Sequence, residues 1–348
     1  MQTVDLEQKN ILVTGAAGFI GSNLVKRLLH DTQTSRIIGI DNMNDYYDPR
    51  LKQQRLDGLK NERFTFVRGD IADRTALDAL FREYKPAVVV NLAAQAGVRY
   101  SITNPDAYIQ SNLIGFYNIL EACRHNPVEH LVYASSSSVY GSNKKVPYST
   151  DDKVDNPVSL YAATKKSNEL LAHAYSKLYN IPSTGLRFFT VYGPAGRPDM
   201  AYFGFTDKLV KGETIQIFNY GNCRRDFTYV DDIVEGVVRI MQGAPEKKQG
   251  GDGLPLPPYA VYNIGNSSPE NLLDFVDILQ QELLRAGVLP RDYDFEAHKQ
   301  LVPMQPGDVP VTFADTSALE RDYGFRPHTP LRDGLRAFAE WYAKEYKS

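Results

Sequence analysis

A tyrosine and a lysine spaced four residues apart are the residues of this sequence best suited to chemistry. Tyr161 and Lys165 lie in the segment SLYAATKKS, and on a helix this spacing places both side chains on one face. A free tyrosine has a pKa near ~10 and is a poor base at neutral pH, but a nearby positive charge favours its phenolate form. Tyr161 is therefore a candidate general base that takes the proton of an alcohol.

A run of serines supplies hydroxyl groups that such a base can use. The segment ASSSSVYG spans residues 134–141 and follows an apolar run that predicts a buried strand. We assign Ser136 as the group that bridges the substrate oxygen to Tyr161. A tyrosine and a lysine at helical spacing most often mark an exposed helix face, so this interpretation depends on a cofactor motif elsewhere in the chain.

Three glycines near the N-terminus provide that motif. Gly15, Gly18 and Gly21 lie in ILVTGAAGFIGSNL, after an apolar strand and at the start of an amphipathic helix. Glycine lets a pyrophosphate approach the backbone, and the amides at the helix start supply partial positive charge. Asp41 ends the next apolar run, RIIGID, about 20 residues further on, where an acid binds ribose hydroxyls and repels a 2′-phosphate. The motif predicts NAD and not NADP; the alternative is a tight turn without a ligand.

The other residues of the predicted NAD site follow strand ends. Asp70 and Ile71 end the third apolar run and are expected at the adenine edge, and LAAQAG, which begins at Leu92, is expected near the phosphates. The remaining expected cofactor contacts are Phe19, Ile20, Asn42, Ala93, Ala94, Gln95, Asn112, Tyr161 and Lys165. The cysteines match no metal-ligand spacing, and no metal is expected.

These motifs lie on an alternation of strands and helices. Continuous runs rich in Val and Ile predict buried parallel strands at residues 10–15, 36–41, 64–70, 87–93 and 130–136, with a sixth at 183–189. Helical spacing of apolar residues predicts helices at 22–30, 75–84, 106–124 and 159–179. The predicted fold class is α/β, with a Rossmann-type doubly wound parallel sheet.

A smaller α/β substrate lobe is expected after the sixth strand. Gly, Pro and charged residues in VYGPAGRPDMAYF break the alternation and place the departure from the sheet near residue 190. We expect an NAD-binding domain at 1–190 and a substrate lobe in most of 191–348. The strand-like run AVYNIG indicates that about 228–265 returns to the first domain. The Gly- and Pro-rich stretch 242–258 is expected to be a surface loop.

Composition excludes several classes of protein. Among 348 residues, 43% are hydrophobic and 23% are charged, which is typical of a globular chain and not of a disordered or fibrous one. The formal net charge of −3 provides no field for nucleic acid, so none is expected as a partner. No run of about 18 apolar residues and no apolar leader is seen, so we expect no membrane association and a cytoplasmic location. Cys123 and Cys223 are expected to be buried thiols.

The motifs together resemble those of the extended short-chain dehydrogenase/reductase family over essentially the whole chain. The resemblance is carried by GAAGFIG, the acid in GIDN, LAAQAGV, SSSSVYG, the pair Tyr161 and Lys165, and RRDFTYVDD. It implies a Rossmann domain with a C-terminal nucleotide-sugar lobe. It also implies that Tyr161 is the base, that Lys165 is its electrostatic and ribose partner, and that Ser136 is the hydroxyl bridge.

The same resemblance implies two further features. Arg225 is expected to contact a diphosphate, for which a surface ion pair with Asp226 is the alternative. The helices at 106–124 and 159–179 carry apolar residues on more than one face, and the family pairs such helices in a four-helix bundle. A homodimer is therefore expected.

The residue at position 138 bears on the type of reaction. Relatives that dehydrate a hexose or decarboxylate a glucuronate resemble one another in carrying Glu just before V-Y-G, where this chain has Ser138. Elimination needs a further acid and base beside the ring, and the serine run supplies no carboxylate. We therefore expect oxidation followed by reduction at carbon 4, an epimerisation in which hydride returns to the opposite face and no NAD is consumed.

Three runs resemble bacterial UDP-glucuronate 4-epimerases, namely RFFTVYGPAGRPDMAYFGFT, LAAQAGVRYS and MQPGDVPVTFAD. A glucuronate needs a seat for its carboxylate, and Arg197 is expected to bind it bidentately. Oxidation at carbon 4 creates a β-keto acid, which loses carbon dioxide readily when the carboxylate bond stands perpendicular to the carbonyl. Holding the carboxylate away from this geometry would protect the intermediate. The expected substrates are UDP-glucuronate and UDP-galacturonate. Their expected contacts are Arg99, Ser137, Ser138, Thr190, Arg197, Arg225 and Asp308.

Two positions depart from the family pattern, and three alternatives stay open. Gln305 stands where many relatives have Arg, so the diphosphate is expected to depend more on Arg225, and Ala195 stands where Trp is common. A UDP-hexose or UDP-N-acetylhexosamine 4-epimerase would need no carboxylate seat. A dehydrogenase would release NADH at each turnover, and a non-catalytic dinucleotide-binding protein would keep only the fold.

Overall fold

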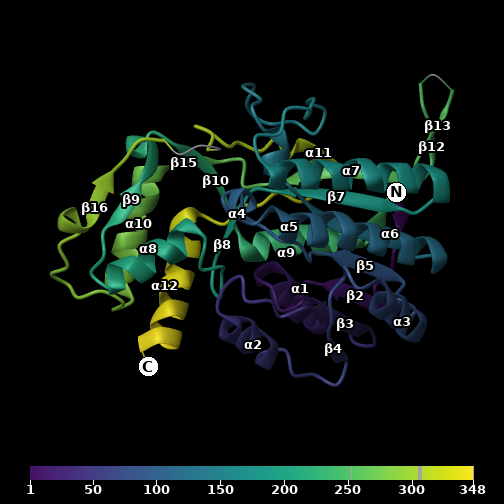
Figure 1. Cartoon of the computed structure of the whole chain (residues 1–348), viewed down its shortest axis with the longest axis horizontal. Coiled ribbons are helices and arrows are strands. Elements are labelled where there is room, and N and C mark those ends of the chain that lie inside the picture. The colour runs from purple at the N-terminus through teal and green to yellow at the C-terminus, as the bar shows by residue number, and fades with distance from the viewer. Residues whose placement is uncertain (252, 305–307, 348) are drawn as a thin grey trace.

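A seven-stranded sheet forms the centre of the larger part of the molecule (Figure 1). The computed structural model describes residues 1–251, 253–304 and 308–347. Neighbouring strands pair in parallel in the order β4-β3-β2-β5-β6-β7-β14, which confirms the predicted doubly wound α/β class. The strands are β2 (Asn10–Thr14), β3 (Arg36–Asp41), β4 (Phe64–Arg68), β5 (Val88–Asn91), β6 (His130–Ser136), β7 (Ser183–Phe188) and β14 (Tyr259–Ile264).

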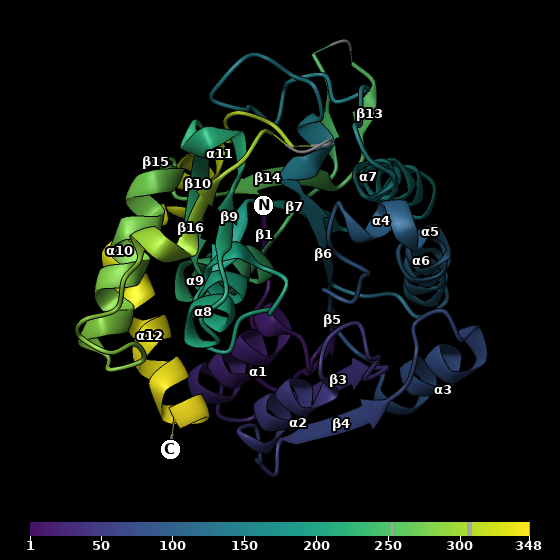
Figure 2. The same ribbon diagram turned by 60° about the vertical axis from the view of Figure 1, so that its left-hand side comes forward.

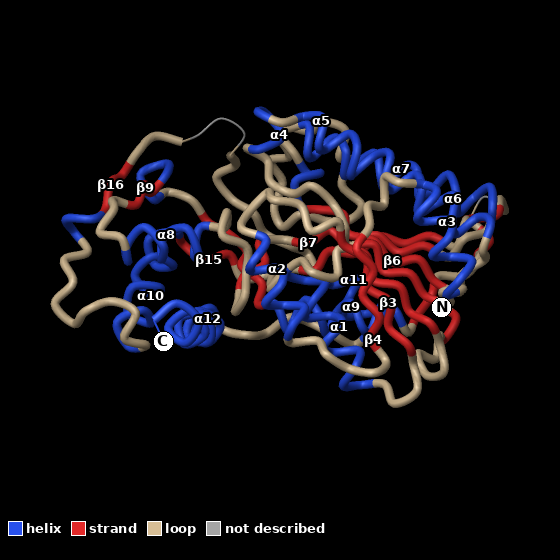
Figure 3. Tube along the Cα trace, turned by 60° about the horizontal axis from the view of Figure 1, so that its bottom comes forward, coloured by secondary structure: helices blue, strands red, loops and turns tan. Residues whose placement is uncertain are grey.

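Helices cover both faces of this sheet, as Figures 2 and 3 show. Because parallel strands need crossover connections, both faces are covered, and the Val and Ile side chains of β2 and β5 are fully buried. One face carries α3 (Arg74–Tyr84), α6 (Gly115–His125) and α7 (Leu160–Tyr179). The opposite face carries α1 (Phe19–Asp31), α9 (Val230–Met241) and α11 (Ser317–Tyr323).

The helix predicted at 106–124 is confirmed, and it contains a π-helical turn. The chain passes from α4 (Tyr100–Thr103) and α5 (Pro105–Tyr108) into a π-helical turn at Ile109–Ile114 before α6 begins. The Asn112 carbonyl in this turn accepts a hydrogen bond of 2.6 Å from Asn168 Nδ2 on α7. Such single turns occur often at functional sites, and apolar periodicity on both sides conceals them in the sequence.

The chain leaves the sheet after β7 and builds a second, smaller group of elements. β8 (Thr190–Tyr192), β10 (Arg224–Tyr229) and β15 (Pro269–Asn271) form a three-stranded sheet, and β9 (Ile215–Ile217) pairs with β16 (Lys299–Leu301). Helices α8 (Ala201–Val210), α10 (Leu272–Arg285) and α12 (Leu331–Lys347) pack beside them (Figure 1). Phe203, Phe275 and Phe338 belong to the core of this group, separate from the cores on the two faces of the large sheet. We call these elements the C-terminal lobe.

The segment between β10 and β15 returns to the large sheet. α9 packs against α1, and β14 pairs in register with β7 at the edge of the sheet. The stretch 242–258 was expected to be a plain loop, but it contains β11 (Gly243–Ala244) and a short hairpin of β12 (Lys248–Gln249) and β13 (Pro255–Leu256). β11 pairs with β1 (Gln2–Thr3), so part of the stretch fixes the start of the chain.

Three further predictions can be compared with the structure. Among the described residues, no helix is long and apolar enough to cross a membrane. No group of three or more His, Cys, Asp or Glu side chains that could hold a metal ion is found in the part of the chain that the structure describes. Cys123 and Cys223 are free and buried, as predicted.

Candidate active site

A cavity of about 1090 Å³ lies between the carboxyl ends of the sheet strands and the C-terminal lobe. Its size and position match those of a nucleotide site in an open α/β sheet, where ligands bind beyond the carboxyl ends of the strands. Most residues predicted from the sequence meet here. They are Gly15, Gly18, Phe19, Ile20, Gly21, Asp41, Asn42, Asp70, Ile71, Leu92, Ala93, Ala94, Gln95, Arg99, Ser136, Ser137, Ser138, Tyr161, Lys165, Thr190, Arg197 and Asp308.

The glycine loop is packed so closely that side chains would not fit. Gly15 has a φ of +69°, and a Cβ there would lie 2.8 Å from the Ala93 amide nitrogen. A Cβ on Gly21 would lie 2.1 Å from the Gly15 carbonyl oxygen. Gly18 caps α1 without a side-chain hydrogen bond, so the first amides of this helix have no side-chain partner at the cap. This cradle of bare backbone beside a helix N-terminus fits the pyrophosphate of a dinucleotide.

The Asp41 carboxylate is fixed at the end of β3. It accepts hydrogen bonds from the amides of Ala17, at 3.2 Å, and of Met43, at 2.9 Å. The Lys52 ammonium on α2 (Pro49–Asp57) lies 3.7 Å from Asp41 and donates to the backbone and side-chain oxygens of Asn44. Burial lowers the pKa of Lys52, and the neighbouring Asp41 charge opposes this shift. Asp41 therefore lies at the cavity wall with a cation beside it that also lines the cavity.

The catalytic pair lies on the first two turns of α7. The Ser159 hydroxyl caps this helix by accepting a hydrogen bond of 3.1 Å from the Ala162 amide, so the helix begins just before Tyr161. Tyr161 and Lys165 then face the end of β6. The Lys165 ammonium donates to the Ala134 carbonyl at 2.9 Å, and the Tyr161 phenol lies near Ser136, which lowers its pKa.

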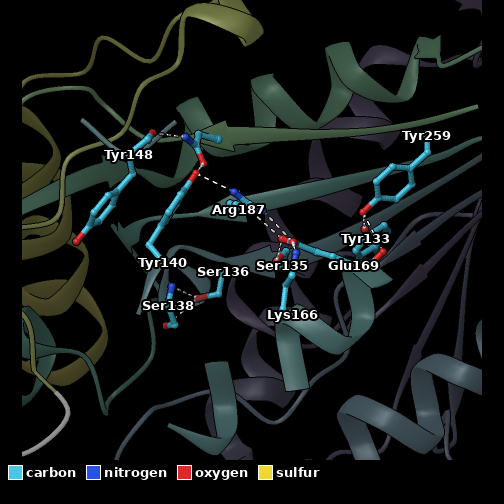
Figure 4. A network of polar contacts seen from close by, with 11 residues as sticks. Tyr133, Ser135, Ser136, Ser138, Tyr140, Tyr148, Lys166, Glu169, Arg187 and Tyr259 are labelled. Carbon is cyan, nitrogen blue, oxygen red and sulfur yellow. Dashed lines mark hydrogen bonds and ion pairs between the residues drawn. The ribbon is translucent and has the colours of Figure 1, made fainter. Parts of the chain in front are cut away.

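The serine run begins as strand and ends as a short turn of 3-10 helix at Ser137–Tyr140. The Ser136 hydroxyl accepts a hydrogen bond from the Ser138 amide at 3.1 Å and donates to the Ser138 hydroxyl at 3.0 Å (Figure 4). Ser136 therefore contacts both the candidate base and the hydroxyl at position 138. The role of Ser136 as the bridge between the substrate and Tyr161 stays a prediction.

Burial changes the acidity of the catalytic pair. Burial raises the pKa of Tyr161, and its hydrogen bond with Ser136 acts in the opposite direction. Burial lowers the pKa of Lys165 to about 8. The site therefore holds a phenol that needs positive charge nearby to ionise, and a lysine whose charge is destabilised by its surroundings.

Arg197 does not present a free guanidinium fork to the cavity. Its Nε and Nη2 atoms donate to the two carboxylate oxygens of Asp199, at 2.9 Å and 2.5 Å. The Tyr46 hydroxyl donates to Asp199 Oδ2 at 3.1 Å and completes this cluster. Arg197 holds the pKa of Asp199 below its usual range, and Asp199 raises that of Arg197. The expected bidentate grip by Arg197 stays a prediction, and Asp199 restricts it to the side of the guanidinium that carries Nη1.

Arg99 crosses from the large sheet to the C-terminal lobe at the cavity wall. Its guanidinium lies 5.0 Å from the centre of the Phe218 ring and 3.7 Å from an oxygen of Asp308. Arg99 and Asp308 are 61% and 31% exposed, so this ion pair is open to water and weak. All three residues line the cavity. Arg99 is thus available for a ligand anion that reaches between the two parts.

Two predicted contacts lie outside the cavity wall. Asn112 is buried beneath it, where its side chain binds the backbone amide and carbonyl of Gln95 at 2.8 Å and 3.0 Å. Arg225 donates to the carbonyls of Arg224 and Pro310, both at 3.1 Å.

The alternative ion pair of Arg225 with Asp226 is not formed. Asp226 is buried and accepts backbone amides from Asn266, Ser267 and Ala314. Gln305 lies outside the described residues. Ala195 has a φ of +54°, a left-handed conformation that non-glycine residues rarely adopt.

Several residues of the site were not found by sequence reasoning. Asp199 and Lys52 line the cavity, and each pairs with a predicted residue. Arg55 on α2 lies behind the wall and donates to the carbonyls of Ala17, Ala195 and Gly196. Asp199 stands only two residues from Arg197, so charge alternation in GRPDM was a usable signal. No local pattern identifies Arg55, because its partners are far away in the sequence.

The fold, the glycine cradle and the catalytic pair define a class of dinucleotide-dependent sugar enzymes. A family model described as the NAD dependent epimerase/dehydratase family matches residues 11–265, and the chain belongs to this family. Protein CapI of Staphylococcus aureus is 52% identical over 343 residues, which covers 97% of this chain and 99% of that protein. A UDP-glucuronate 4-epimerase of Arabidopsis thaliana is 48% identical over 343 residues, covering 97% of this chain and 76% of that protein.

The fold is also similar to a solved structure. The crystal structure of the UDP-glucuronic acid 4-epimerase of Bacillus cereus, in complex with UDP-glucuronic acid and NAD, has a TM-score of 0.84 to this chain. The two chains are 34% identical, and the match covers 97% of this chain and 100% of that one. The resemblance drawn from the sequence motifs is confirmed at the level of the family.

Proposed function

We propose that this protein is an NAD-dependent isomerase that interconverts UDP-glucuronate and UDP-galacturonate by epimerisation at carbon 4. One observation carries the proposal: Tyr161, Lys165 and Ser136 line the same cavity as the glycine cradle and Arg197. The relatives at 48% and 34% identity carry the names of UDP-glucuronate 4-epimerases, which agrees with this substrate. The cavity volume of about 1090 Å³ leaves room for a dinucleotide together with a nucleotide sugar.

The cradle at Gly15, Gly18 and Gly21 fits the pyrophosphate of NAD, and the Asp41 carboxylate fits the ribose hydroxyls. Lys165 is placed to hold the nicotinamide ribose. NAD, when bound, accepts the hydride from carbon 4 of the sugar and returns it to the opposite face. The protein contributes binding, orientation and proton transfer.

Tyr161 takes the proton from the carbon 4 hydroxyl as the sugar is oxidised and gives it back when the ketone is reduced. Ser136, which lies near Tyr161, is proposed to hold the same sugar oxygen and to relay the proton. Burial raises the pKa of Tyr161, whereas the charge of Arg197 lowers it, and the charge of Lys165 is proposed to favour the phenolate further. Between the two half-reactions the 4-keto sugar must turn over inside the cavity.

The sugar carboxylate is proposed to lie against Ser137, Ser138, Thr190 and the face of Arg197 that Asp199 leaves open. Hydroxyl donors around one carboxylate fix its plane relative to the carbon 4 carbonyl. When the bond that joins the carboxylate to the ring is held near the plane of the ketone, the sugar does not lose carbon dioxide readily. We propose that this seat is what keeps the β-keto acid intact.

The two parts of the chain are proposed to bind different ligands. Residues 1–190, with 228–265, bind NAD, and most of 191–348 binds the UDP group. Arg99 and Asp308 lie where both parts meet and are proposed contacts of the diphosphate or sugar. Arg225 can contact the diphosphate only if its guanidinium gives up its hydrogen bonds to the carbonyls of Arg224 and Pro310.

A UDP-hexose is the second candidate substrate, and one observation favours it. The charge of Arg197 is already balanced by Asp199, so an uncharged sugar would leave no unpaired cation in the cavity. The catalytic residues and the cofactor would be the same for both substrates.

Proton NMR of the purified protein with UDP-glucuronate, UDP-glucose and UDP-N-acetylglucosamine in separate tubes tests the proposal. We expect UDP-galacturonate signals without added NAD, because the cofactor is proposed to stay bound through the cycle. Turnover of only the neutral sugars would select the second candidate. A UDP-pentose product would contradict the role of the carboxylate seat. Release of NADH, measured by its nicotinamide absorption band, would indicate a dehydrogenase.

We also propose a homodimer. The partner-facing surface would consist of α6 and α7, which lie side by side on the same face of the sheet (Figure 2). Large apolar side chains are exposed there at Ile114, Tyr117, Leu170 and Leu178. Such residues on adjacent helices favour burial against a second copy. The free, buried cysteines fit the expected cytoplasmic location.

A further inference from the structure

Three successive turns of α7 contact three successive residues of β6. Tyr161 lies near Ser136, which lowers the pKa of its phenol, and Lys165 donates to the Ala134 carbonyl at 2.9 Å. One turn further on, Glu169 accepts a hydrogen bond of 2.7 Å from the Ser135 hydroxyl. Residues 161, 165 and 169 follow a spacing of four and share one face of the helix. The first two contacts belong to the catalytic pair, and the third has no role in the proposed mechanism.

Glu169 also joins β6 to the neighbouring strand β7. Ser135 and Arg187 are partners in the β6–β7 register, and Glu169 contacts both. Its two carboxylate oxygens accept from Arg187 Nε at 2.8 Å and Nη2 at 2.9 Å (Figure 4). The side chains of Glu169 and Arg187 are 3% and 4% exposed, respectively, so this bidentate pair is shielded from water. One carboxylate therefore fixes the helix against two adjacent strands.

The contacts continue from Arg187 to β14 and to the segment before α11. Arg187 Nη1 donates to the Tyr140 hydroxyl at 3.1 Å, and that hydroxyl donates to Asn263 Oδ1 at 2.6 Å. Asn263 is the register partner of Arg187 on β14. Its amide nitrogen donates to the carbonyls of Tyr148 and Asp315, at 2.8 Å and 3.0 Å. A continuous set of buried polar contacts thus extends from the catalytic helix to the segment that precedes α11.

A buried ion pair is a poor way to stabilise a fold, because desolvation of the two charges offsets their attraction. Its directional contacts instead specify one arrangement of the elements that they join. Here the elements joined are the helix that carries the base and the strand that ends in the serine bridge. A small slip between them would separate Tyr161 from Ser136 and Lys165 from Ala134.

We propose that Glu169 is a positioning residue for the reaction, acting through Ser135 and Arg187 to hold Tyr161 in register with Ser136. It touches neither substrate nor cofactor in this role. The inference rests on the proposed function only for the choice of substrate, since any carbon 4 oxidation by Tyr161 needs the same register.

The test is Ser135→Ala, which removes the Ser135–Glu169 hydrogen bond but leaves Glu169 paired with Arg187. Ser176→Ala is the matched control, because Ser176 is also buried on α7 and donates one hydrogen bond of 2.9 Å, to the Pro258 carbonyl, away from the catalytic residues. Both variants are measured as kcat and KM per NAD-loaded site, together with Tm. The substrate is UDP-glucuronate, or whichever UDP-sugar the unaltered protein converts.

We expect Ser135→Ala to lower kcat about tenfold with little change in KM, because misalignment slows the chemical step and not binding. Ser176→Ala is expected to keep kcat within about twofold at a similar change in Tm. Equal kcat values for the two variants, or a change in KM alone, would overturn the proposal.

Glu169→Gln provides a second readout and leaves the Arg187 charge without its partner. We expect it to lose more kcat than Ser135→Ala, and to lose Tm as well. Full kcat in a folded Glu169→Gln protein would overturn the proposal. If the variant does not fold, the comparison of Ser135→Ala with Ser176→Ala decides. Failure of the unaltered protein to convert UDP-glucuronate would contradict the proposed substrate and leave this comparison intact on another sugar.

Discussion

The carboxylate of Asp199 covers the Nε–Nη2 edge of Arg197, so two charges two residues apart neutralise each other at the cavity wall. A substrate carboxylate meets this pair and not a lone cation. The consequence is that Arg197 and Asp199 must be judged together, since removal of either one exposes the charge of the other.

Arg197→Met should therefore harm an anionic substrate in two ways. It removes the cation, and it leaves Asp199 as an unpaired anion beside the sugar carboxylate. We expect kcat/KM for UDP-glucuronate to fall about a hundredfold, and the double variant Arg197→Met/Asp199→Asn to regain about tenfold of that loss. Steady-state kinetics of the two variants measure both values. A double variant no better than the single one, or equal losses with UDP-glucose, would show that Arg197 does not face the carboxylate.

Tyr161→Phe removes the proposed base and keeps the ring that packs in the site. Loss of general base catalysis is expected to lower kcat about a thousandfold. Binding of NAD and UDP-glucuronate should change little, which calorimetry of the purified variant measures. Substantial turnover by Tyr161→Phe would assign the base to another group.

Asp41→Asn should relax the choice of cofactor. The variant loses the charge that repels a 2′-phosphate, and Lys52, which lies 3.7 Å from Asp41, becomes available to pair with that phosphate. We expect the ratio of bound NADP to NAD to rise at least about tenfold. Chromatography of the nucleotides released by denaturing the purified protein measures this ratio. Adding Lys52→Met should cancel the gain, and a gain that survives Lys52→Met would contradict the explanation.

Leu170→Glu should produce a monomer. Leu170 is 60% exposed on α7, within the surface proposed to meet a second copy, and a buried unpaired carboxylate there would be costly. Light scattering coupled to gel filtration gives the mass of the particle. Val210→Glu on α8 is the control for a charge on another exposed apolar residue, and it should leave the dimer intact. A dimer that tolerates Leu170→Glu would place the interface elsewhere.

His130 should make the protein less stable in mild acid. Its ring is buried at the start of β6, within 2.8 Å of Thr184 Oγ1 and 3.3 Å of the Met241 carbonyl, and burial lowers its pKa to about 4. The unfolded chain binds a proton at His130 near pH ~6.5, and the folded chain does not until about pH 4. The free energy of unfolding therefore falls as the pH drops through this window, by about 3 kcal/mol from this residue.

Urea unfolding at several pH values between 4 and 7 measures this loss. His130→Gln should flatten the pH dependence by about one proton. An unchanged slope in His130→Gln would show that another group is responsible.

The parts of the site that the sequence could predict are those with a local pattern. Gly15, Gly18 and Gly21 follow a strand and begin a helix, and Tyr161 and Lys165 have the helical spacing, so both motifs could be recognised and placed. The strands were found because Val and Ile run without interruption in a sheet that is covered on both faces.

The parts that escaped prediction depend on contacts between distant segments. The charge alternation in GRPDM was a signal for the counter-ion of Arg197, but it could not decide the matter, because the same spacing is consistent with two solvated side chains. Glu169 and Arg187 are 18 residues apart. The sequence predicts Glu169 on a helix surface and Arg187 inside a strand, and no sequence pattern indicates that the two side chains pair. The π-helical turn at Ile109–Ile114 has the apolar pattern of an ordinary helix, and only its backbone hydrogen bonding distinguishes it.

Arg55 has a consequence for attempts to redesign the sugar specificity. Its guanidinium holds the carbonyl of Ala17 in the nucleotide loop and those of Ala195 and Gly196 in the loop that carries Arg197. The guanidinium of Arg55 therefore holds both loops. If residues 193–200 are replaced by the loop of a relative, NAD will be retained less well unless the new loop places carbonyls in the same positions. A useful library would keep the backbone around Ala195 and Gly196 and vary only the side chains that reach the cavity.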